Sequence, residues 1–420
     1  MRLSRTVAPW LAIACAVGLA LQMTTSTASP PAVEAVAPAA VTAQLGGQQV
    51  WAHFTNPRAH DGRDATIHEE VVRLIDAAPA GSTIRGTIYS LSVQPVARAL
   101  VAAERRGVTV LVLVDGDNEA STSPAVDILK QLHSVRFCSW DPAAYGSTQR
   151  SGGGCISSSD DGDLHVKMFT FTETADPSGA SRSDVSWFSS ANMTYATGSD
   201  QFNNAVTVYG DGALMNGLDH YFTDLWDRRP YPGDDYYDAL ARRGYVQAPA
   251  AAVYASPEGP DQTDTVVSRL DDLTPDTRCQ IRIGMSFATS ARPNLLRFVT
   301  GAKAKGCRVW MVVGSSNGAI RMPRDVYTTL TKAGVSIRRV AGVHDKFFAV
   351  YGKFGRQYQY RVYTGSQNWS GSALRSNDEI FVKLAPETGA SHPLYNGFAS
   401  HFGDAWSVCR PCTASTYPCR

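Results

Sequence analysis

The sequence carries little charge, and neither sign dominates. Only 18% of its 420 residues are charged, and 39 lysines and arginines face 38 acidic residues, which gives a formal charge of +1. This balance excludes a protein that binds nucleic acid through bulk positive charge, and it also excludes an acidic disordered tail. Hydrophobic residues make up 44% of the chain, enough for a large core in two domains or one large domain.

The N-terminal apolar run is too short to cross a bilayer easily. It covers residues 7–21, which is 15 residues, whereas a spanning helix needs roughly 20. Two arginines precede it and small residues follow it, so residues 1–28 are predicted to be a secretory signal peptide. An uncleaved anchor is the alternative, and a second cleavage site could follow residues 35–37. The protein is therefore expected to be secreted and extracellular, with an Ala/Pro-rich tether at 29–48.

A recognisable zinc-binding pattern is also missing. The C-terminal tail, residues 409–420, contains Cys409, Cys412 and Cys419, but no histidine lies at a useful ligand spacing. Disulfides persist in an oxidising compartment, so in an exported protein we expect the cysteines to be paired. One of the three tail cysteines would remain without a partner inside the tail.

Two disulfides can be placed in the rest of the chain. Cys138 and Cys155 flank a polar stretch, and a bridge between them would pin a long loop. Cys279 and Cys307 each open a strand-like run. If these runs are parallel neighbours, their starts lie side by side and a bridge is geometrically reasonable.

The chain is an internal repeat of two copies. Expected helices at 67–77 and 265–273 begin the copies, and a strand–helix series follows in each. The matching runs are 82–91 with 279–287, 94–106 with 293–305, 108–114 with 307–313, 126–132 with 326–333, and 135–138 with 335–339. Strands that alternate with helices predict an α/β fold in which each half has a mainly parallel sheet flanked by helices.

The repeat also predicts the domain boundaries. The N-terminal half would cover 49–229, a Pro- and Tyr-rich linker 230–250, and the C-terminal half 251–408. The spacing between the copies falls from 199 at their glycines to 179 at their histidines, so the first copy contains 20 extra residues between these landmarks.

A histidine and a lysine lie two residues apart in each copy. They are His165 and Lys167 in the first half and His344 and Lys346 in the second. On a strand, this spacing puts both side chains on one face. One such pair is usually an ordinary strand residue pair, but its recurrence in both halves favours a functional site.

About 25 residues after each histidine, a turn ends in asparagine. The turns contain Ser190 and Asn192 in one copy, and Ser366 and Asn368 in the other. Two histidines without metal-ligand spacing suit phosphoryl chemistry, in which one attacks phosphorus and the other protonates the leaving oxygen. The lysines and asparagines would hold the other phosphate oxygens.

In these residues the sequence resembles the phospholipase D superfamily, specifically its secreted bacterial-type members. The signature of that family is His-x-Lys-x4-Asp followed by Gly-Ser-x-Asn, once per half, and the resemblance extends from about Trp51 to Trp406. It implies two phospholipase D-like halves packed as a pseudo-dimer, with one active site on their shared seam. It also implies hydrolysis of phosphoric diesters without a metal or cofactor.

The resemblance assigns roles to the site residues. His165 would be the nucleophile that forms a phosphohistidine, and His344 would be the general acid. The near-symmetry of the halves leaves the reverse assignment open. Glu379 fits the glutamate that the family carries shortly after the asparagine, and it would orient one imidazole.

Several positions depart from the family pattern. Thr172 and Tyr351 stand where each motif has its aspartate, and Ser189 replaces the motif glycine of the first half. The first half has Ala205 at the position where Glu379 is expected to repeat. A catalytically inactive module that binds phosphorylated ligands therefore stays open as an alternative.

The expected substrate is a phospholipid at a membrane or vesicle surface, cleaved to phosphatidic acid and a free headgroup by a monomeric enzyme. Trp140, Tyr145, Tyr195 and Trp369 lie near the motifs and could border an acyl-facing mouth, or could simply be packing aromatics. The alternative is a secreted nuclease of the same superfamily. A nuclease would need a basic groove, which the net charge does not indicate.

Overall fold

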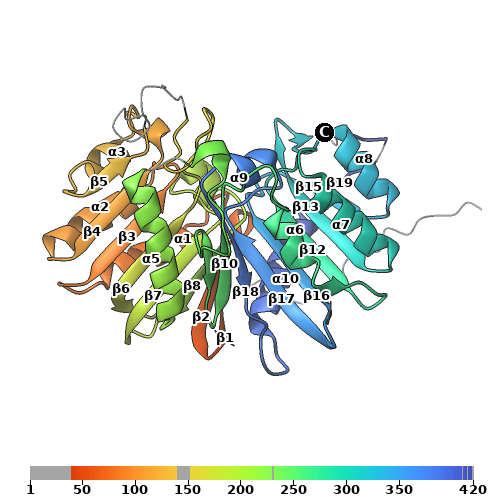
Figure 1. Ribbon diagram of the computed structural model, residues 1–420, viewed down its shortest axis with the longest axis horizontal. Helices are drawn as coiled ribbons and strands as arrows, with labels where there is room; N and C mark the ends of the chain where they lie inside the picture. Colours follow the sequence, from red (N-terminus) through yellow and green to blue (C-terminus); the bar gives the residue numbers. More distant parts are fainter. Residues whose placement is uncertain (1–38, 140–151, 229–230, 409, 414, 419–420) are drawn as a thin grey trace, which may run out of the picture.

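The computed structural model describes residues 39–139, 152–228, 231–408, 410–413 and 415–418. The predicted signal peptide lies outside the described residues. In the described part of the chain, no helix is long and apolar enough to cross a membrane. Two halves lie side by side, the first in orange to green and the second in green to blue (Figure 1).

Both halves follow the predicted order of strands and helices. The first half contains β1 (Ala40–Leu45), β2 (Gln48–Thr55), α1 (Thr66–Asp76), β3 (Thr83–Ile88), α2 (Gln94–Arg105), β4 (Thr109–Val114), α3 (Pro124–Leu129), β5 (Val135–Phe137), β6 (Met168–Ala175), β7 (Ser181–Ser189), β8 (Asn203–Tyr209) and α5 (Gly212–Asp227). The second half contains β9 (Tyr245–Gln247), β10 (Ala251–Ser256), α6 (Thr265–Leu270), β11 (Leu273–Thr274), β12 (Gln280–Met285), α7 (Pro293–Ala304), β13 (Arg308–Ser316), β14 (Ala319–Ile320), α8 (Arg324–Lys332), β15 (Ser336–Val340), β16 (Lys346–Phe354), β17 (Gln357–Gly365), α9 (Gly371–Arg375), β18 (Glu379–Leu384), α10 (Pro393–Ser407) and β19 (Arg410–Pro411).

The two sheets share one strand order, which confirms the duplicated α/β fold. The order β2-β8-β7-β6-β3-β4-β5 in the first sheet corresponds to β10-β18-β17-β16-β12-β13-β15 in the second. The prediction of mainly parallel sheets is wrong. Within these corresponding orders, only β3-β4-β5 and β12-β13-β15 are parallel, and the other neighbours are antiparallel. The reason is that a short turn joins β6 to β7 and β16 to β17, and only a five-residue helix lies between β7 and β8 and between β17 and β18, whereas a parallel pair needs a longer crossover.

Local sequence explains the connections that remain parallel. α2 and α7 each have a proline in the first turn, where the missing N–H costs nothing. They end before Gly107 and Gly306, whose φ angles of 92° and 104° lie in the left-handed region. Each helix therefore stops where the next parallel strand must begin.

The halves are joined along a seam of reciprocal backbone contacts. Leu164 of the first half bridges Asp378 of the second, and Phe202 of the first half bridges Val343 of the second. A hydrophobic core built from both halves lies between the sheets. α10 packs on β17 of its own half and on β1 and β2 of the other half. The seam is therefore a packed interface at which segments from both halves meet.

Each of the segments predicted as tether, linker and tail contains one short β-strand that pairs with a neighbouring strand. β1 occupies 40–45 of the predicted 29–48 tether and pairs with β2. β9 lies inside the predicted linker 230–250 and pairs with β10. β19 lies in the Cys-rich tail 409–420 and pairs with β15. Pairing with a neighbouring strand overrides the weak composition signal in these short segments.

Both predicted disulfides are present. Cys138 and Cys155 have a Cα–Cα distance of 4.9 Å, and Cys279 and Cys307 one of 4.5 Å. The second pair joins the starts of the parallel neighbours β12 and β13, as expected. Cys412 is also disulfide-bonded, while residues 409 and 419 lie outside the described residues.

Candidate active site

The two His-x-Lys motifs lie on the seam, at corresponding ends of the two sheets. His165 and Lys167 belong to the segment just before β6, and His344 precedes β16, which starts at Lys346. The motifs therefore sit mainly at strand entrances, rather than within strands as the spacing predicted. The backbone N–H of His165 donates to Asp378 of the other half, and that of His344 donates to Phe202. Each motif is thus held by the opposite half.

The imidazole of His165 pairs with a carboxylate from the second half. Its Nδ1 lies 2.8 Å from Oε2 of Glu379. Glu379 is the first residue of β18 and is completely buried. This contact places Glu379 where it can orient a motif histidine. Because Nδ1 is engaged, Nε2 is the ring nitrogen left for substrate chemistry.

The imidazole of His344 pairs with a carboxamide from the first half. Its Nδ1 lies 3.0 Å from Oδ1 of Asn203. The Asn203 Nδ2 group donates to the backbone carbonyls of Gly198 and Gln201, at 3.0 and 3.1 Å. These bonds fix the carboxamide so that its oxygen faces the His344 ring.

Asn203, not Ala205, is the counterpart of Glu379. Asn203 follows Asn192 by 11 residues, just as Glu379 follows Asn368 by 11, and each is the first residue of its strand. The earlier assignment of Ala205 is therefore wrong. Counting from the asparagine rather than searching for an acidic residue would have found Asn203.

The two lysines are buried in the same site. Lys167 and Lys346 are 1% and 2% exposed. Lys346 Nζ donates to the backbone oxygen of Ser190 across the seam at 3.2 Å, and it lies 2.9 Å from His344 Nδ1. Lys167 Nζ donates to the backbone carbonyl of His165 and lies 4.7 Å from the centre of the Tyr89 ring. Two ammonium groups so deeply buried indicate a site built for an anion.

The motif asparagines are fixed through their backbones. The carbonyl of Asn192 contacts His68 Nε2 at 2.9 Å, and the carbonyl of Asn368 accepts from Arg292 at 3.2 Å. Arg292 is itself paired with Asp264, the N-cap of α6. The side-chain oxygens of both asparagines are buried and have no hydrogen-bond partner among the described residues. Unsatisfied polar atoms of this kind are typical of a site that holds water or a ligand.

Burial and the crowded charges shift the pKa values of the site. Burial lowers the pKa of both histidines well below the usual range, and the two lysines add to this effect. Burial also lowers the pKa of Lys167 to about 7, against the opposing pull of Glu379. Burial raises the pKa of Glu379 to about 7, and Lys167 opposes that rise. Neutral imidazoles can attack phosphorus, so these shifts prepare the site for nucleophilic chemistry.

A family model described as "Cardiolipin synthase, PLD-like domain" matches residues 71–226 and 276–406, one segment in each half. These segments cover most of the chain and contain every motif residue. The chain belongs to the phospholipase D superfamily.

One solved structure supports the fold of this phospholipase D superfamily member, and two others show weaker likenesses. A phosphatidylserine synthase from Haemophilus influenzae Rd KW20 has 12% identity and a TM-score of 0.52, with 90% of each chain covered. Nuc, a phospholipase D family member from Salmonella typhimurium, has 21% identity over 39% of this chain and 97% of its own, with a TM-score of 0.31. A polyphosphate kinase from Porphyromonas gingivalis has 12% identity and a TM-score of 0.47; the match covers 80% of this chain but only 47% of the kinase. No curated protein matches the chain.

The residues that replace the superfamily's motif aspartates do not touch the catalytic groups. The Thr172 hydroxyl accepts from the backbone N–H of Thr83 at 2.8 Å, and the Tyr351 hydroxyl accepts from Arg278 at 3.1 Å. Neither Thr172 nor Tyr351 therefore contacts a motif histidine through these bonds.

The motif serines support the strand starts that face the two imidazoles. Ser190 Oγ donates to Asn203 Oδ1 at 3.0 Å, and Ser366 Oγ accepts from the backbone N–H of Ile380 at 3.1 Å. Both serines are fully buried. They therefore act on the histidines through Asn203 and Glu379, as supporting residues.

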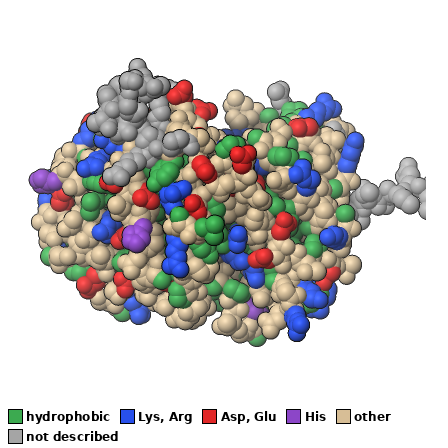
Figure 2. Space-filling view, viewed as in Figure 1, with side chains coloured by type: hydrophobic (Ala, Val, Ile, Leu, Met, Phe, Trp, Pro, Cys, Tyr) green, Lys and Arg blue, Asp and Glu red, His purple; other side chains and the backbone are tan. Residues whose placement is uncertain are grey.

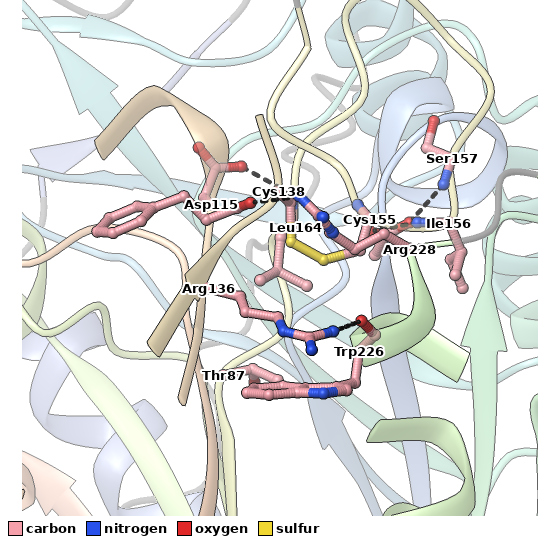
Figure 3. Close-up of a disulfide and its surroundings, with 12 residues drawn as sticks. Thr87, Asp115, Arg136, Cys138, Cys155, Ile156, Ser157, Leu164, Trp226 and Arg228 are labelled. Carbon is pink, nitrogen blue, oxygen red and sulfur yellow. Dashed lines mark hydrogen bonds between the residues drawn. A yellow bond between two sulfur atoms is a disulfide. The ribbon is translucent and has the colours of Figure 1, made fainter. Parts of the chain in front are cut away.

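The segment after Cys155 leads directly into the first motif. The Asp378 carboxylate accepts backbone N–H groups from Cys155, Ile156 and Ser157. The Asp115 carboxylate accepts from Leu164, and the bridge to Cys138 lies between these two anchors (Figure 3). The segment is thus fixed from both halves. The sequence contained no signal for Asp378 as an anchor.

Three carboxylates stand close together beside the first motif. Oxygens of Asp115, Asp117 and Asp163 lie within 4.8 Å of one another. Burial raises the pKa of Asp115 to about 8 and that of Asp163 to about 6. Asp115 also accepts backbone N–H groups from Asp117 and Leu164, so its carboxylate has a structural role beside the first motif.

The aromatic residues proposed for an acyl-facing mouth divide into two groups. Trp369 is completely buried in the core of the second half, so it is a packing residue. Tyr195 is 37% exposed and stacks with the Arg63 guanidinium. Trp140 and Tyr145 lie outside the described residues.

Proposed function

We propose that this chain is a secreted phospholipase D-like phosphodiesterase that hydrolyses a phospholipid headgroup ester through a phosphohistidine intermediate. One observation carries the proposal: His165 is paired with Glu379 across the seam, in a buried site that also contains His344 and both lysines. A nucleophile, an orienting carboxylate, a second proton-transfer group and two cations are the groups that this reaction requires.

In the first step, Nε2 of His165 attacks phosphorus and a nitrogen–phosphorus bond forms. The bond from phosphorus to the headgroup oxygen breaks, and His344 gives that oxygen a proton. The phosphorylated ring is cationic, and the Glu379 carboxylate at Nδ1 stabilises it. In the second step, water attacks phosphorus and His344 takes its proton. The nitrogen–phosphorus bond then breaks and phosphatidic acid leaves.

Substrate binding allows His344 to take up from solvent the proton that it later gives to the leaving oxygen. In the empty site, burial and the neighbouring lysines keep the pKa of His344 low. A bound phosphodiester carries a negative charge that offsets the lysines and raises the affinity of His344 for a proton. The acid is therefore formed when substrate is present.

Three features favour a phospholipid over a nucleic acid. The chain has almost no net charge. The face in Figure 2 shows basic and acidic side chains interspersed, with no continuous basic band on it. The matching family model is named for cardiolipin synthase, and cardiolipin is a phospholipid. A secreted nuclease and an inactive phosphate-binding module are the alternatives to be tested.

The test is to incubate the purified protein with phosphatidylcholine vesicles and, separately, with plasmid DNA, both in the presence of EDTA. The proposal expects phosphatidic acid and choline to form, with the DNA left intact. DNA cleavage without lipid turnover would identify a nuclease, and vesicle binding without turnover would identify the inactive module. Loss of turnover in EDTA would identify a metal requirement. Sequencing the N-terminus of protein recovered from the culture medium tests export.

A further inference from the structure

Asp345 lies between the two motif residues of the second half and carries a buried carboxylate that the mechanism above does not use. It is 1% exposed. One oxygen accepts from His401 Nε2 at 2.9 Å, and the other accepts from the Asn204 side chain at 2.7 Å. His401 is fully buried on α10, and Asn204 lies on β8 of the other half. The carboxylate therefore ties two distant elements to the motif.

Asn204 connects this carboxylate to the partner of His344. It directly follows Asn203, whose oxygen faces the His344 ring. Its own side-chain oxygen accepts from Thr364 at 2.5 Å, at the end of β17. With both ends of its side chain held, Asn204 fixes the start of β8 and with it the position of the Asn203 oxygen.

The described residues of the first half contain no such network. Val166 takes the place of Asp345 between the motif residues, and Tyr221 takes the place of His401 in the matching helix. The Tyr221 hydroxyl makes one long hydrogen bond, 3.4 Å, to the backbone of Glu379. The ring of His165 pairs with a carboxylate, whereas the ring of His344 contacts the Asn203 amide and the Lys346 ammonium and has no carboxylate of its own among the described residues.

We propose that Asp345, His401 and Asn204 form a positioning unit that holds His344 and Lys346 in place for phosphodiester chemistry. The unit acts through Asn203 and the motif backbone. The backbone oxygen of Asp345 also accepts from the backbone N–H of Ser286 at 2.8 Å. Hydrogen bonds therefore hold both the backbone and the side chain of Asp345. The inference rests on the proposed function for its kinetic readout only.

The test compares Asp345→Asn, His401→Leu and His401→Gln, with Tyr221→Phe as the matched control at the equivalent position of the first half. In Asp345→Asn, the new amide N–H would face either the His401 ring N–H or the Asn204 amide N–H, and two donors cannot bond to each other. Gln at 401 keeps an N–H donor for the carboxylate, and Leu does not. Turnover of bis(p-nitrophenyl) phosphate is measured for each variant.

A displacement of about 1 Å in a catalytic group can cost roughly a hundredfold in rate. We therefore expect Asp345→Asn and His401→Leu to lower kcat roughly 10- to 100-fold, with KM changed less than about threefold. His401→Gln should retain most of the wild-type kcat, and Tyr221→Phe should retain all of it. If His401→Leu keeps wild-type kcat, or if His401→Gln is as damaging as His401→Leu, the positioning unit is refuted.

A second measurement does not depend on activity. In protein labelled with ¹⁵N at histidine, the ring signals of His344 should shift in Asp345→Asn and His401→Leu and should stay in place in Tyr221→Phe. Unchanged His344 signals in the first two variants would overturn the inference. An inactive wild type would instead refute the proposed function, while the ring signals would still decide the positioning unit. If Asp345→Asn does not fold, the two His401 variants give the same decision.

Discussion

The two halves place different residues at one equivalent position, and the difference assigns separate roles to their histidines. Glu379 contacts His165 at 2.8 Å, and Asn203 contacts His344 at 3.0 Å. A carboxylate stabilises positive charge that stays on a ring through the life of a phosphohistidine. A carboxamide fixes the orientation of a ring without holding its charge, which suits a group that must give up a proton and take it back. This asymmetry supports His165 as the nucleophile.

At the residue scale, Glu379→Gln should lower kcat/KM by on the order of a hundredfold or more, because it removes the charge that orients and stabilises the His165 ring. Thr172→Ala should stay within about threefold of wild type, since its hydroxyl bonds only to the Thr83 backbone. Steady-state kinetics of the two variants checks this order. A Thr172→Ala variant that is the more damaging of the two would contradict our account of how the site works without its motif aspartates.

The activity should have a narrow pH optimum close to 7. Burial raises the pKa of Glu379 to about 7, so the carboxylate that orients His165 is lost as the pH falls below that value. Burial lowers the pKa of Lys167 to about 7, so a phosphate-binding charge is lost as the pH rises above it. Because the two groups interact, the limbs of the profile belong to the pair.

Two variants separate the limbs of this profile. Glu379→Gln should remove the acidic limb, and Lys167→Arg should move the alkaline limb to higher pH because a guanidinium stays charged. Profiles of kcat/KM for the three proteins are the measurement. An acidic limb that survives in Glu379→Gln would show that another group causes it.

At the scale of elements, the two disulfides should contribute alike to stability but differently to activity. Cys138–Cys155 precedes the segment that Asp378 anchors and that leads into His165. Cys279–Cys307 joins the starts of β12 and β13, whereas the site lies near the other end of β12, where Met285 pairs with Lys346. The second bridge is therefore a matched control for the first.

Replacing either pair of cysteines by serine should lower the free energy of unfolding by about 3 kcal/mol, as loops of this size predict. Only Cys138→Ser/Cys155→Ser should also lower kcat/KM, because it loosens the approach to His165. Denaturant unfolding and steady-state kinetics on both double variants make the comparison. Equal losses of activity in the two double variants would show that activity falls because stability falls, and not because the approach to His165 is loosened.

The sequence predicted the elements well where one periodic run corresponds to one element. The runs at 94–106 and 293–305 became α2 and α7 within one residue, because a first-turn proline and a closing glycine mark their ends. Strand direction could not be predicted in the same way. An apolar run such as 168–171 has the same sequence pattern whether its strand is parallel or antiparallel to the next one. Only the connection to β7 decides the direction.

The site was predictable where it repeats and was missed where the halves differ. His165 and His344 stood out because both copies carry them. Asp345 and His401 did not, since their counterparts Val166 and Tyr221 share neither charge nor shape with them. Asp378 was missed for a different reason: its role depends on backbone N–H groups brought across the seam, and a sequence does not show these.

At the scale of the whole molecule, the crossed contacts make the two halves one catalytic unit. Lys346 reaches the backbone of Ser190 in the other half, and each motif histidine is oriented from the opposite half. Mixing purified His165→Ala and His344→Ala proteins should therefore restore no activity, because both histidines must belong to one chain. The mixture is assayed beside each variant alone. Recovered turnover would show that halves are exchanged between chains.

The central claim is that His165 attacks phosphorus while His344 supplies the proton, and a single-turnover experiment with bis(p-nitrophenyl) phosphate tests it most directly. Nitrophenolate leaves without needing a proton, so His344→Ala should release about one equivalent and then stop. Mass spectrometry under alkaline conditions should find the phosphoryl adduct on the peptide that contains His165. The matched variant His165→Ala should release none. An adduct on the His344 peptide, or a burst from His165→Ala, would contradict the account.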